Sequence, residues 1–487
     1  MLGLIFFILI VAIINLFFIS SNNRELIKKL SIIYSSVVLI LSSLLLFLFD
    51  LNNSYFQFYT IIPFLKNEIL NLQFHFALDG ISILFYVLSS FLIFLCIVFI
   101  QEEKYLKEYM LSLFLIHIIL LFIFSILDLF LFYIFFEALL IPMYLLIGIW
   151  GSRERKIRAA YLLFFYTVCG SLLFLIAIIY IYTVTGTFDY EYLSSFKFNQ
   201  NEQLLLWLCF FISFASKIPM FPFHIWLPEA HVEAPTVGSV LLAGILLKLG
   251  VYGFLRYSLV LFPEASIFFT PLVYTLSIIG IIYASLNAIR QTDLKRIIAY
   301  SSIAHMNLIV LGLFSFNSIG LEGAILQSIS HGFVSGALFL LVGVVYDRYH
   351  TRLLFYYGGL VHTMPLYASF LLLFTMANIA LPGTSSFVGE FTLLLGIFKN
   401  SIFTCVVSAI SVVLSGAYSL WLYNRIMFGN LKINYTIKYK DLTKREFLIL
   451  IPLAILVIFI GIYPNYLLKF ITLSTISELN VYCYNFN

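Results

Sequence analysis

Long apolar runs, separated by short polar clusters, constrain the fold of this chain more than any other feature. A transmembrane helix needs about 20 consecutive apolar residues, and with a short connector each crossing takes roughly 30 to 35. Because the chain has 487 residues, about 14 crossings fit into it. Only 10% of the residues are charged, whereas soluble domains have roughly a quarter. The sequence therefore predicts an all-α polytopic membrane protein and excludes a soluble enzyme, a nucleic-acid-binding protein and a disordered scaffold.

Hydropathy divides the chain into 14 predicted spans. They are residues 2–20, 30–50, 78–100, 109–127, 129–150, 159–183, 204–225, 235–258, 268–289, 297–315, 322–346, 365–395, 402–427 and 447–470. The run at 365–395 is too long for one straight crossing. We therefore expect that span to tilt, break or unwind.

Basic residues alternate strongly between the two sets of connectors that these spans define. Twenty of the 27 lysines and arginines lie in the connectors after odd-numbered spans, and five lie on the opposite side. Basic loops face the cytoplasm or, in an organelle, the matrix. The alternation supports the number of spans and places both termini on the outer side. The two remaining basic residues, Lys217 and Lys248, fall inside apolar spans.

Six predicted spans each carry one ionisable side chain in their apolar interior. These candidates are Glu137, Lys217, Lys248, His305, His331 and Glu390. The bilayer penalises such groups, so an ionisable residue within a span is a functional candidate. A series of carboxylates, lysines and histidines can pass protons sideways as their pKa values switch, with water between the groups. We therefore predict a proton relay.

A structural alternative explains part of this set. Glu137 and Lys217 would form a buried ion pair that fixes helix packing, and each histidine would be a hydrogen-bonded core residue. Such a pair leaves Lys248 without an obvious partner, so the relay is favoured for the set as a whole. Asp128 and Glu322 lie near span ends, where a solvated carboxylate costs little. We leave both out of the relay.

Two predicted spans combine a charge with prolines. Two prolines follow Lys217, and Pro382 precedes Glu390. Proline removes a backbone donor, and such breaks persist in a membrane only where protein or water satisfies the freed carbonyls. Paired broken spans in corresponding halves of a chain mark the ion path of transporters. Because the broken spans 7 and 12 are five apart, we expect two inverted five-helix repeats, spans 4–8 and 9–13, each with a broken helix.

Motifs for nucleotide binding, metal binding and nucleophilic catalysis are absent from the sequence. It has no Walker A loop, no G-x-G-x-x-G, no G-x-S-x-G and no H-E-x-x-H. The five cysteines include no C-x-x-C pair. The segment LPEAHVEAPT at 227–236 contains an H-x-E but lacks the cysteines of a deaminase zinc site. We interpret it as a polar turn on the basic side and a candidate point of proton uptake.

Three stretches of the sequence resemble the antiporter-like subunits of proton-pumping NADH–quinone oxidoreductase, respiratory complex I. They are KIPMFPFHIWLPEAHVEAPTVGSVLLAGILLKLGVYGFLR at 217–256, DLKRIIAYSSIAHMN at 293–307 and ANIALPGTSSFVGEF at 377–391. The similarity extends from about Phe76 to Pro464. Among the three antiporter-like subunits it is strongest to subunit 4, called M in bacteria, of the plant-type or protist mitochondrial kind.

The resemblance implies a position for each candidate of the relay. Glu137 matches the carboxylate on the fifth helix, and Lys217 matches the lysine on the broken seventh helix. Lys248 matches the central lysine of the eighth helix, and the two histidines match those of the central hydrophilic axis. Glu390 matches the terminal carboxylate of the broken twelfth helix, where the related subunits have lysine.

The same resemblance implies four parts of the chain. They are an N-terminal three-helix segment (1–108), a first antiporter-like repeat (109–258), a second antiporter-like repeat (259–428) and a C-terminal basic loop with the last helix (429–487). It also implies a location in the mitochondrial inner membrane, with several crossings and the basic loops facing the matrix.

As function, the resemblance implies a proton-translocating membrane-arm subunit of complex I. The chain would belong to the H⁺-translocating NADH:ubiquinone reductase and carry out no redox chemistry itself. It would hold no cofactor and no metal, whereas NAD, FMN, iron–sulfur clusters and ubiquinone would bind partner subunits. Its partners would be other membrane-arm subunits, including two further antiporter-like subunits, together with lipids and protons, but no nucleic acid. A subunit of a multi-subunit cation/proton antiporter and a non-transporting membrane scaffold are the alternatives.

Overall fold

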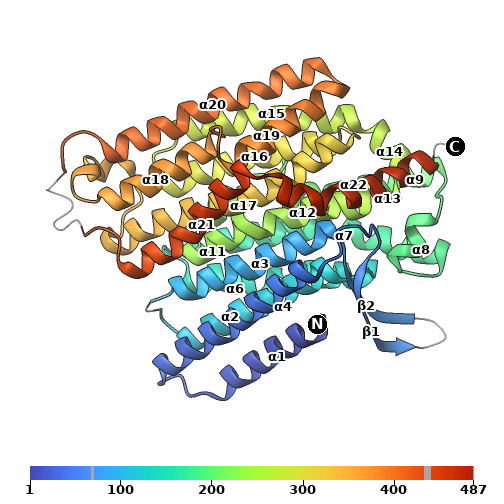
Figure 1. The fold of residues 1–487 in the computed structure, drawn as a ribbon, viewed down its shortest axis with the longest axis horizontal. Coiled ribbons are helices and arrows are strands. Elements are labelled where there is room, and N and C mark those ends of the chain that lie inside the picture. Colours follow the sequence, from blue (N-terminus) through green and yellow to red (C-terminus); the bar gives the residue numbers. More distant parts are fainter. Residues whose placement is uncertain (67–70, 102, 433–439, 486–487) are drawn as a thin grey trace. The chain divides into compact units, whose positions relative to one another are not determined.

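The computed structural model describes residues 1–66, 71–101, 103–432 and 440–485, with the backbone alone at 62–66, 71–73 and 477–485. The chain forms two compact units. Unit 1 comprises Met1–Lys217, Tyr252–Phe269 and Lys469–Asn487, and unit 2 comprises Ile218–Val251 and Thr270–Leu468. Most of the described residues in both units are helical (Figure 1).

Unit 1 holds the N-terminal helices and one pair of β-strands. Its elements are α1 (Leu2–Phe18), α2 (Arg24–Leu48), β1 (Gln57–Lys66), β2 (Asn71–Leu78), α3 (Gly80–Phe99), α4 (Leu106–Ser125), α5 (Leu129–Ala138), α6 (Leu140–Trp150), α7 (Lys156–Thr185), α8 (Tyr190–Ser195), α9 (Gln200–Lys217), the π-helix η2 (Phe254–Ser258), α13 (Leu259–Leu261) and α14 (Pro263–Phe268).

Unit 2 holds the longest helix of the described chain, α17. Its elements are α10 (Trp226–Glu233), α11 (Thr236–Leu241), the π-helix η1 (Leu242–Leu246), α15 (Thr270–Arg290), α16 (Leu294–Leu313), α17 (Ser318–Tyr349), the short 3₁₀ helices η3 (Leu354–Tyr356) and η4 (Leu360–His362), α18 (Pro365–Asn378), α19 (Ser385–Asn400), α20 (Ile402–Met427) and α21 (Lys444–Ile462). Two more helices, α12 (Leu247–Gly253) and α22 (Asn465–Asn485), contain residues of both units.

Eleven helices among the described residues are long and apolar enough to cross a membrane. Each of them overlaps one of the 14 predicted spans. The other three predicted spans, 2–20, 204–225 and 365–395, contain shorter helices, namely α1, α9 and the pair α18 and α19. The prediction of a helical polytopic membrane protein is therefore confirmed. Residues 433–439 of the predicted C-terminal basic loop lie outside the described residues.

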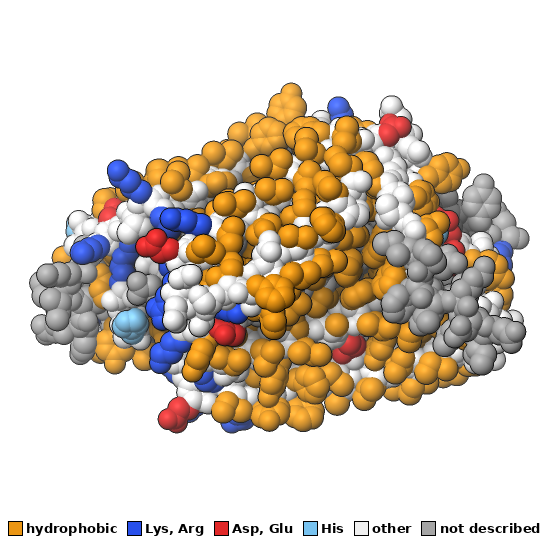
Figure 2. Space-filling model, turned by 90° about the horizontal axis from the view of Figure 1, so that it is seen from below, with side chains coloured by type: hydrophobic (Ala, Val, Ile, Leu, Met, Phe, Trp, Pro, Cys, Tyr) orange, Lys and Arg blue, Asp and Glu red, His pale blue; other side chains and the backbone are white. Residues whose placement is uncertain are grey.

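Side chains on the surface agree with a lipid environment. Phe403, Val406 and Val413 of α20 are 75%, 62% and 72% exposed. Hydrophobic side chains dominate the face shown in Figure 2, whereas lysines and arginines gather towards one end of it. In water such a surface would be unfavourable, but it matches the acyl chains of a bilayer.

A two-stranded antiparallel sheet departs from the predicted all-α fold. Its strands β1 and β2 pair between the helices α2 and α3. The segment lies between predicted spans 2 and 3, where no structure is expected from hydropathy. It includes the sequence FYTII at 58–62, and aromatic and β-branched residues of this kind favour strands.

Both predicted helix breaks are present. Helix α9 ends at Lys217, because Pro219 lacks a donor and disfavours helical geometry at the residue before it. The run at 365–395 divides into α18 and α19, and Ala380 and Gly383 adopt positive φ angles of 64° and 92° in the break. A left-handed conformation suits glycine and costs other residues about 1–2 kcal/mol. The interior of this span is therefore unwound.

Glycines bring α17 and α19 into close contact within unit 2. A Cβ added at Gly396 would lie 2.4 Å from the Cα of Gly320, and one added at Gly389 would lie 2.8 Å from the Cα of Gln327. Small residues allow the backbones of membrane helices to approach in this way. The contact holds the residue after Gly389, Glu390, against the helix that carries His331.

Candidate functional site

Lys248 lies in a helix distorted on both sides. The helix α12, which contains it, follows the π-helix η1 and precedes the π-helix η2. The Lys248 Nζ donates to the carbonyl oxygen of Ala243, five residues earlier. Turns of π-helix shift the backbone hydrogen bonds and are frequent at functional sites. The side chain is fully buried, at 0% exposure, so its polar contacts are made inside the protein.

Four of the six predicted residues form one chain of contacts within unit 2. The Nζ of Lys248 lies 2.7 Å from the Nδ1 of His331 on α17. The rings of His331 and His305, on α16, have centroids 5.8 Å apart. The Nδ1 of His305 then lies 2.9 Å from the Oε1 of Glu390 on α19. Four helices thus bring a lysine, two histidines and a carboxylate into one row.

This row is shielded from solvent. His331, His305 and Glu390 are 3%, 6% and 4% exposed. The Nε2 atoms of both histidines have no hydrogen-bond partner among the described residues. Each imidazole contacts a neighbour in the row through Nδ1 and has Nε2 free to accept or donate a proton. An imidazole ring can accept a proton at one nitrogen while it donates one from the other.

Glu137 and Lys217 lie together in unit 1. Glu137 is near the end of α5, and Lys217 is the last residue of α9. The Lys217 Nζ lies 4.4 Å from the centroid of the Phe136 ring, and the charges of the lysine and of Glu137 interact. Within the described part of the chain, neither the Nζ nor the Glu137 Oε1 has a hydrogen-bond partner. The direct ion pair of the structural alternative is therefore not formed.

Comparison with known proteins decides the family. The family described as "NADH:quinone oxidoreductase/Mrp antiporter, TM" matches residues 126–415. The NADH-ubiquinone oxidoreductase chain 4 of Marchantia polymorpha is 53% identical over 423 residues, which cover 86% of this chain and 85% of that protein. The chain belongs to the chain 4 family of NADH–ubiquinone oxidoreductase.

Bacterial proteins support the same assignment. Subunit M of the NADH-quinone oxidoreductase of Rhodobacter capsulatus is 49% identical over 411 residues, covering 82% of this chain and 80% of that protein. A chain in the structure of respiratory complex I from Thermus thermophilus with bound NADH has a TM-score of 0.88 and 29% identity, and the match covers 99% of both chains. This member of the chain 4 family is a proton-translocating membrane subunit of complex I, part of NADH:ubiquinone oxidoreductase together with other subunits. The family model also covers Mrp antiporters, but the relatives named here are all subunits of NADH oxidoreductases.

Gln327 is part of the row in this family member, although the sequence analysis omitted it. Its Nε2 donates to the Oε1 of Glu390 at 3.0 Å. It lies four residues before His331 on α17, so the two side chains share a face of the helix. That spacing is the sequence signal that could have identified it. Because Gln327 and His305 both contact one carboxylate oxygen, they fix the orientation of Glu390.

A second buried cluster in unit 2 surrounds Arg352. This side chain is 0% exposed, and its guanidinium lies 3.9 Å from Glu233 and 3.8 Å from Asp293. Close by, the Nζ of Lys295 donates to the carbonyl of Ala234 at 2.7 Å. Hydropathy places Arg352 and Lys295 in the connectors between predicted spans, and a single sequence does not show which loop charges find buried partners.

The LPEAHVEAPT segment is not the polar turn that we expected. Residues Trp226–Glu233 form α10, and Glu233 and His231 are 2% and 0% exposed. The His231 ring stacks on the Phe339 ring with centroids 4.6 Å apart. The segment folds inward because the buried cations of the Arg352 cluster and this aromatic ring accommodate its polar groups.

Asp79 and Arg256 form a buried ion pair in unit 1 that the sequence analysis also missed. The Arg256 Nη2 lies 2.7 Å from the Asp79 Oδ2, and both side chains are less than a tenth exposed. Burial raises the pKa of the Asp79 carboxyl, but the guanidinium and hydrogen bonds with Ser82 outweigh that effect, so its pKa lies below the usual value. Asp79 also caps α3 by accepting from the Ser82 amide. The pair therefore joins the start of α3 to η2.

No metal site is found among the residues that the structure describes. No group of three or more histidine, cysteine, aspartate or glutamate side chains in those ranges is arranged to hold a metal ion. The four described cysteines are free thiols.

Asp128 is buried, contrary to the expected solvated position. It is 6% exposed and accepts a hydrogen bond at 2.8 Å from the Leu131 amide, capping α5. Burial raises the pKa of its carboxyl to about 7, although that hydrogen bond opposes the shift. Between its ordinary pKa of about 3.9 and 7, the folded state then binds more protons than the unfolded state. Stability from this group is present at low pH and is lost as pH rises through 7.

We expect Asp128→Asn to remove that part of the pH dependence. The asparagine oxygen keeps the cap but does not titrate. Between about pH 5 and pH 8, the unfolding temperature of the wild-type protein should fall by a few degrees more than that of the variant. Thermal unfolding of the detergent-solubilised complex measures this difference. If the unfolding temperatures of the two proteins changed in parallel with pH, the raised pKa of Asp128 would be contradicted.

Proposed function

We propose that Glu137, Lys217, Lys248, His305, His331 and Glu390 form a lateral proton relay through this subunit. The observation that carries the proposal is the row from Lys248 to Glu390, in which two contacts are shorter than 3 Å. A buried row of alternating proton donors and acceptors has little value for packing alone, because each buried polar group costs free energy unless it is satisfied.

Proton transfer starts, in this proposal, with the charge of Glu137. A nearby carboxylate stabilises the buried Lys217 ammonium, whereas separation of the two charges leaves the ammonium desolvated and favours its neutral form. The released proton passes to Lys248 and then through His331 and His305 to Glu390. Because Lys217 and Glu137 make no direct hydrogen bond to each other, a modest movement of either side chain changes their interaction.

The proposed topology has 14 crossings and two inverted five-helix repeats. The first repeat occupies 109–258 and the second 259–428, between an N-terminal three-helix segment at 1–108 and a C-terminal part at 429–487. Two features support it: a helix end at Lys217 and an unwound segment between α18 and α19. These breaks fall in spans 7 and 12, at equivalent places in the two repeats.

We further propose the mitochondrial inner membrane as location, with the basic loops facing the matrix. The alternation of basic residues and the mitochondrial-type relatives support this. Two further antiporter-like subunits, lipids and protons would be the partners of the chain. NAD, FMN, iron–sulfur clusters and ubiquinone would bind to other subunits, whose redox reaction would drive the proton movement.

Glu390→Gln tests the terminal group of the relay. Glutamine keeps the shape of the side chain and a hydrogen bond with Gln327, but it cannot take up and release a proton. We expect proton transfer at this step to slow by roughly 10²-fold or more, and Glu390→Asp to retain part of the activity. The measurement is proton uptake by sealed vesicles that contain the complex and oxidise NADH.

Glu322→Gln is the matched control for this test. Glu322 lies on α17, is partly exposed and is outside the row, so its substitution should leave pumping unchanged. Equal losses in the two glutamine variants would indicate a general defect rather than a relay. Full pumping by Glu390→Gln would refute the proposed end of the path.

A further inference from the structure

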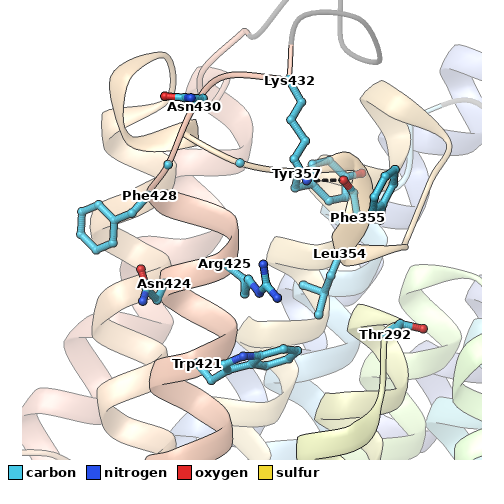
Figure 3. A pocket seen from close by; sticks show the side chains of 12 residues that line it. Thr292, Leu354, Phe355, Tyr357, Trp421, Asn424, Arg425, Phe428, Asn430 and Lys432 are labelled. Carbon is cyan, nitrogen blue, oxygen red and sulfur yellow. Dashed lines mark hydrogen bonds between the residues drawn. The ribbon is translucent and has the colours of Figure 1, made fainter.

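A cavity of about 630 Å³ opens in unit 2 where three predicted basic connectors meet (Figure 3). Its walls come from Thr292, from residues 354–358 and from residues 421–432. The first two segments follow α15 and α17, and the third comprises the end of the membrane helix α20 and the residues after it. The cavity therefore lies at the end of a membrane-crossing helix, on the side of the basic loops.

Two cations line this cavity. Arg425 lies in the last turn of α20, and its guanidinium is 5.7 Å from the centroid of the Trp421 ring. Lys432 reaches in from the opposite rim, donates to the Phe355 carbonyl and lies 4.9 Å from the Phe355 ring centroid. In Figure 3 the Arg425 guanidinium points into the space between α20 and Leu354. None of the twelve described residues that line the cavity is acidic.

The surroundings of the two cations are aromatic and partly exposed. Phe355 and Phe428 are 67% and 55% exposed, and Trp421 forms part of the wall. Aromatic side chains concentrate where a membrane meets water, because their rings tolerate both environments. Cationic pockets between membrane helices on the basic side bind the head groups of anionic lipids.

We propose that this pocket binds the phosphate of an anionic phospholipid, whose acyl chains lie along the exposed apolar face of α20. The Arg425 guanidinium offers two parallel donors to phosphate oxygens, and Lys432 adds a point charge. The C-terminal carbonyls of α20 disfavour an anion here. Binding therefore depends on the two cations, and their removal leaves a site that repels phosphate.

The test is photo-crosslinking of the assembled complex with phosphatidylglycerol that carries a diazirine near its head group. Mass spectrometry of the peptides then locates the label. We expect labelling within residues 421–432, with an apparent affinity about fivefold lower for each cation removed in Arg425→Gln and Lys432→Gln. Arg425→Lys keeps the charge but loses the paired donors, so its affinity should lie between those of Arg425→Gln and the wild type.

Three comparisons decide the outcome. Phosphatidylcholine with the same diazirine and Arg290→Gln, an exposed arginine at the end of α15 outside the cavity, serve as controls. Weak labelling by phosphatidylcholine and full labelling of Arg290→Gln support the proposal. Equal labelling by both lipids, or no effect of Arg425→Gln in a complex that still oxidises NADH, overturns it. Displacement of the label by millimolar inorganic phosphate would show a site for free phosphate and also overturn the lipid assignment.

Discussion

Replacing Lys248 with methionine is expected to stop proton transfer through the middle of the proposed relay. Methionine fits the buried space but carries no exchangeable proton, so the step between Lys217 and His331 loses its carrier. Loss of a positioned acid–base group slows proton transfer by about 10²–10⁴-fold. The Ala243 carbonyl and the His331 Nδ1 lose their partner as well, which costs about 1–3 kcal/mol of stability for each group left unsatisfied.

Pumping and NADH oxidation should be measured together in sealed vesicles that contain the Lys248→Met complex. Lys399→Met, an exposed lysine near the end of α19, is the matched control and should behave as wild type. Assembly is checked by native electrophoresis with in-gel NADH oxidation. Normal pumping by an assembled Lys248→Met complex would show that protons take another path.

Arg352→Met should cause the largest loss of stability. The substitution removes the cation between Glu233 and Asp293 and leaves two buried carboxylates without it. Breaking a buried ion pair by removing one partner costs about 3–5 kcal/mol. We expect the variant chain to accumulate poorly, or the complex to unfold at a clearly lower temperature. The measurement is the amount and thermal stability of the solubilised complex.

Arg296→Met is the comparison for that variant. Arg296 pairs with Glu229 at 2.7 Å, but both side chains are about one third exposed, and such pairs contribute only about 0–1 kcal/mol. The difference in stability between the Arg352→Met and Arg296→Met complexes tests whether burial of an ion pair sets the free-energy cost of breaking it. Similar stability of the two variants would contradict the claim that the buried cluster around Arg352 stabilises the protein.

Hydropathy predicts membrane helices well and says little about the segments between them. Apolar runs long enough to cross a bilayer correspond to helices here, because a buried backbone in lipid must satisfy its hydrogen bonds internally. The strands β1 and β2 fall between two runs and were missed. The sequence at 226–233 predicts a polar turn. These residues instead fold as a buried helix, because basic side chains distant in sequence lie close to their carboxylates.

The relay candidates were found because each is an isolated ionisable group in an apolar run. Which of them touch was not predictable, since contacts such as His305 with Glu390 depend on how α16 and α19 pack. Gln327 was missed because it carries no charge, and Asp128 was placed in solvent because it lies at a span end. Packing also decides the surroundings of Lys217. The opposite charges of Glu137 and Lys217 predicted an ion pair, but the structure places the Phe136 ring beside the lysine instead.

The most direct test of the relay is the number of protons pumped per NADH oxidised by the complex carrying Lys217→Met. The complex is first shown to be assembled by native electrophoresis, and pumping and oxidation are then recorded on the same sealed vesicles. The relay predicts that the complex assembles and that pumping is lost, because no other group in the proposed path takes up the proton held beside Glu137. An unchanged proton yield in the assembled variant would contradict the relay.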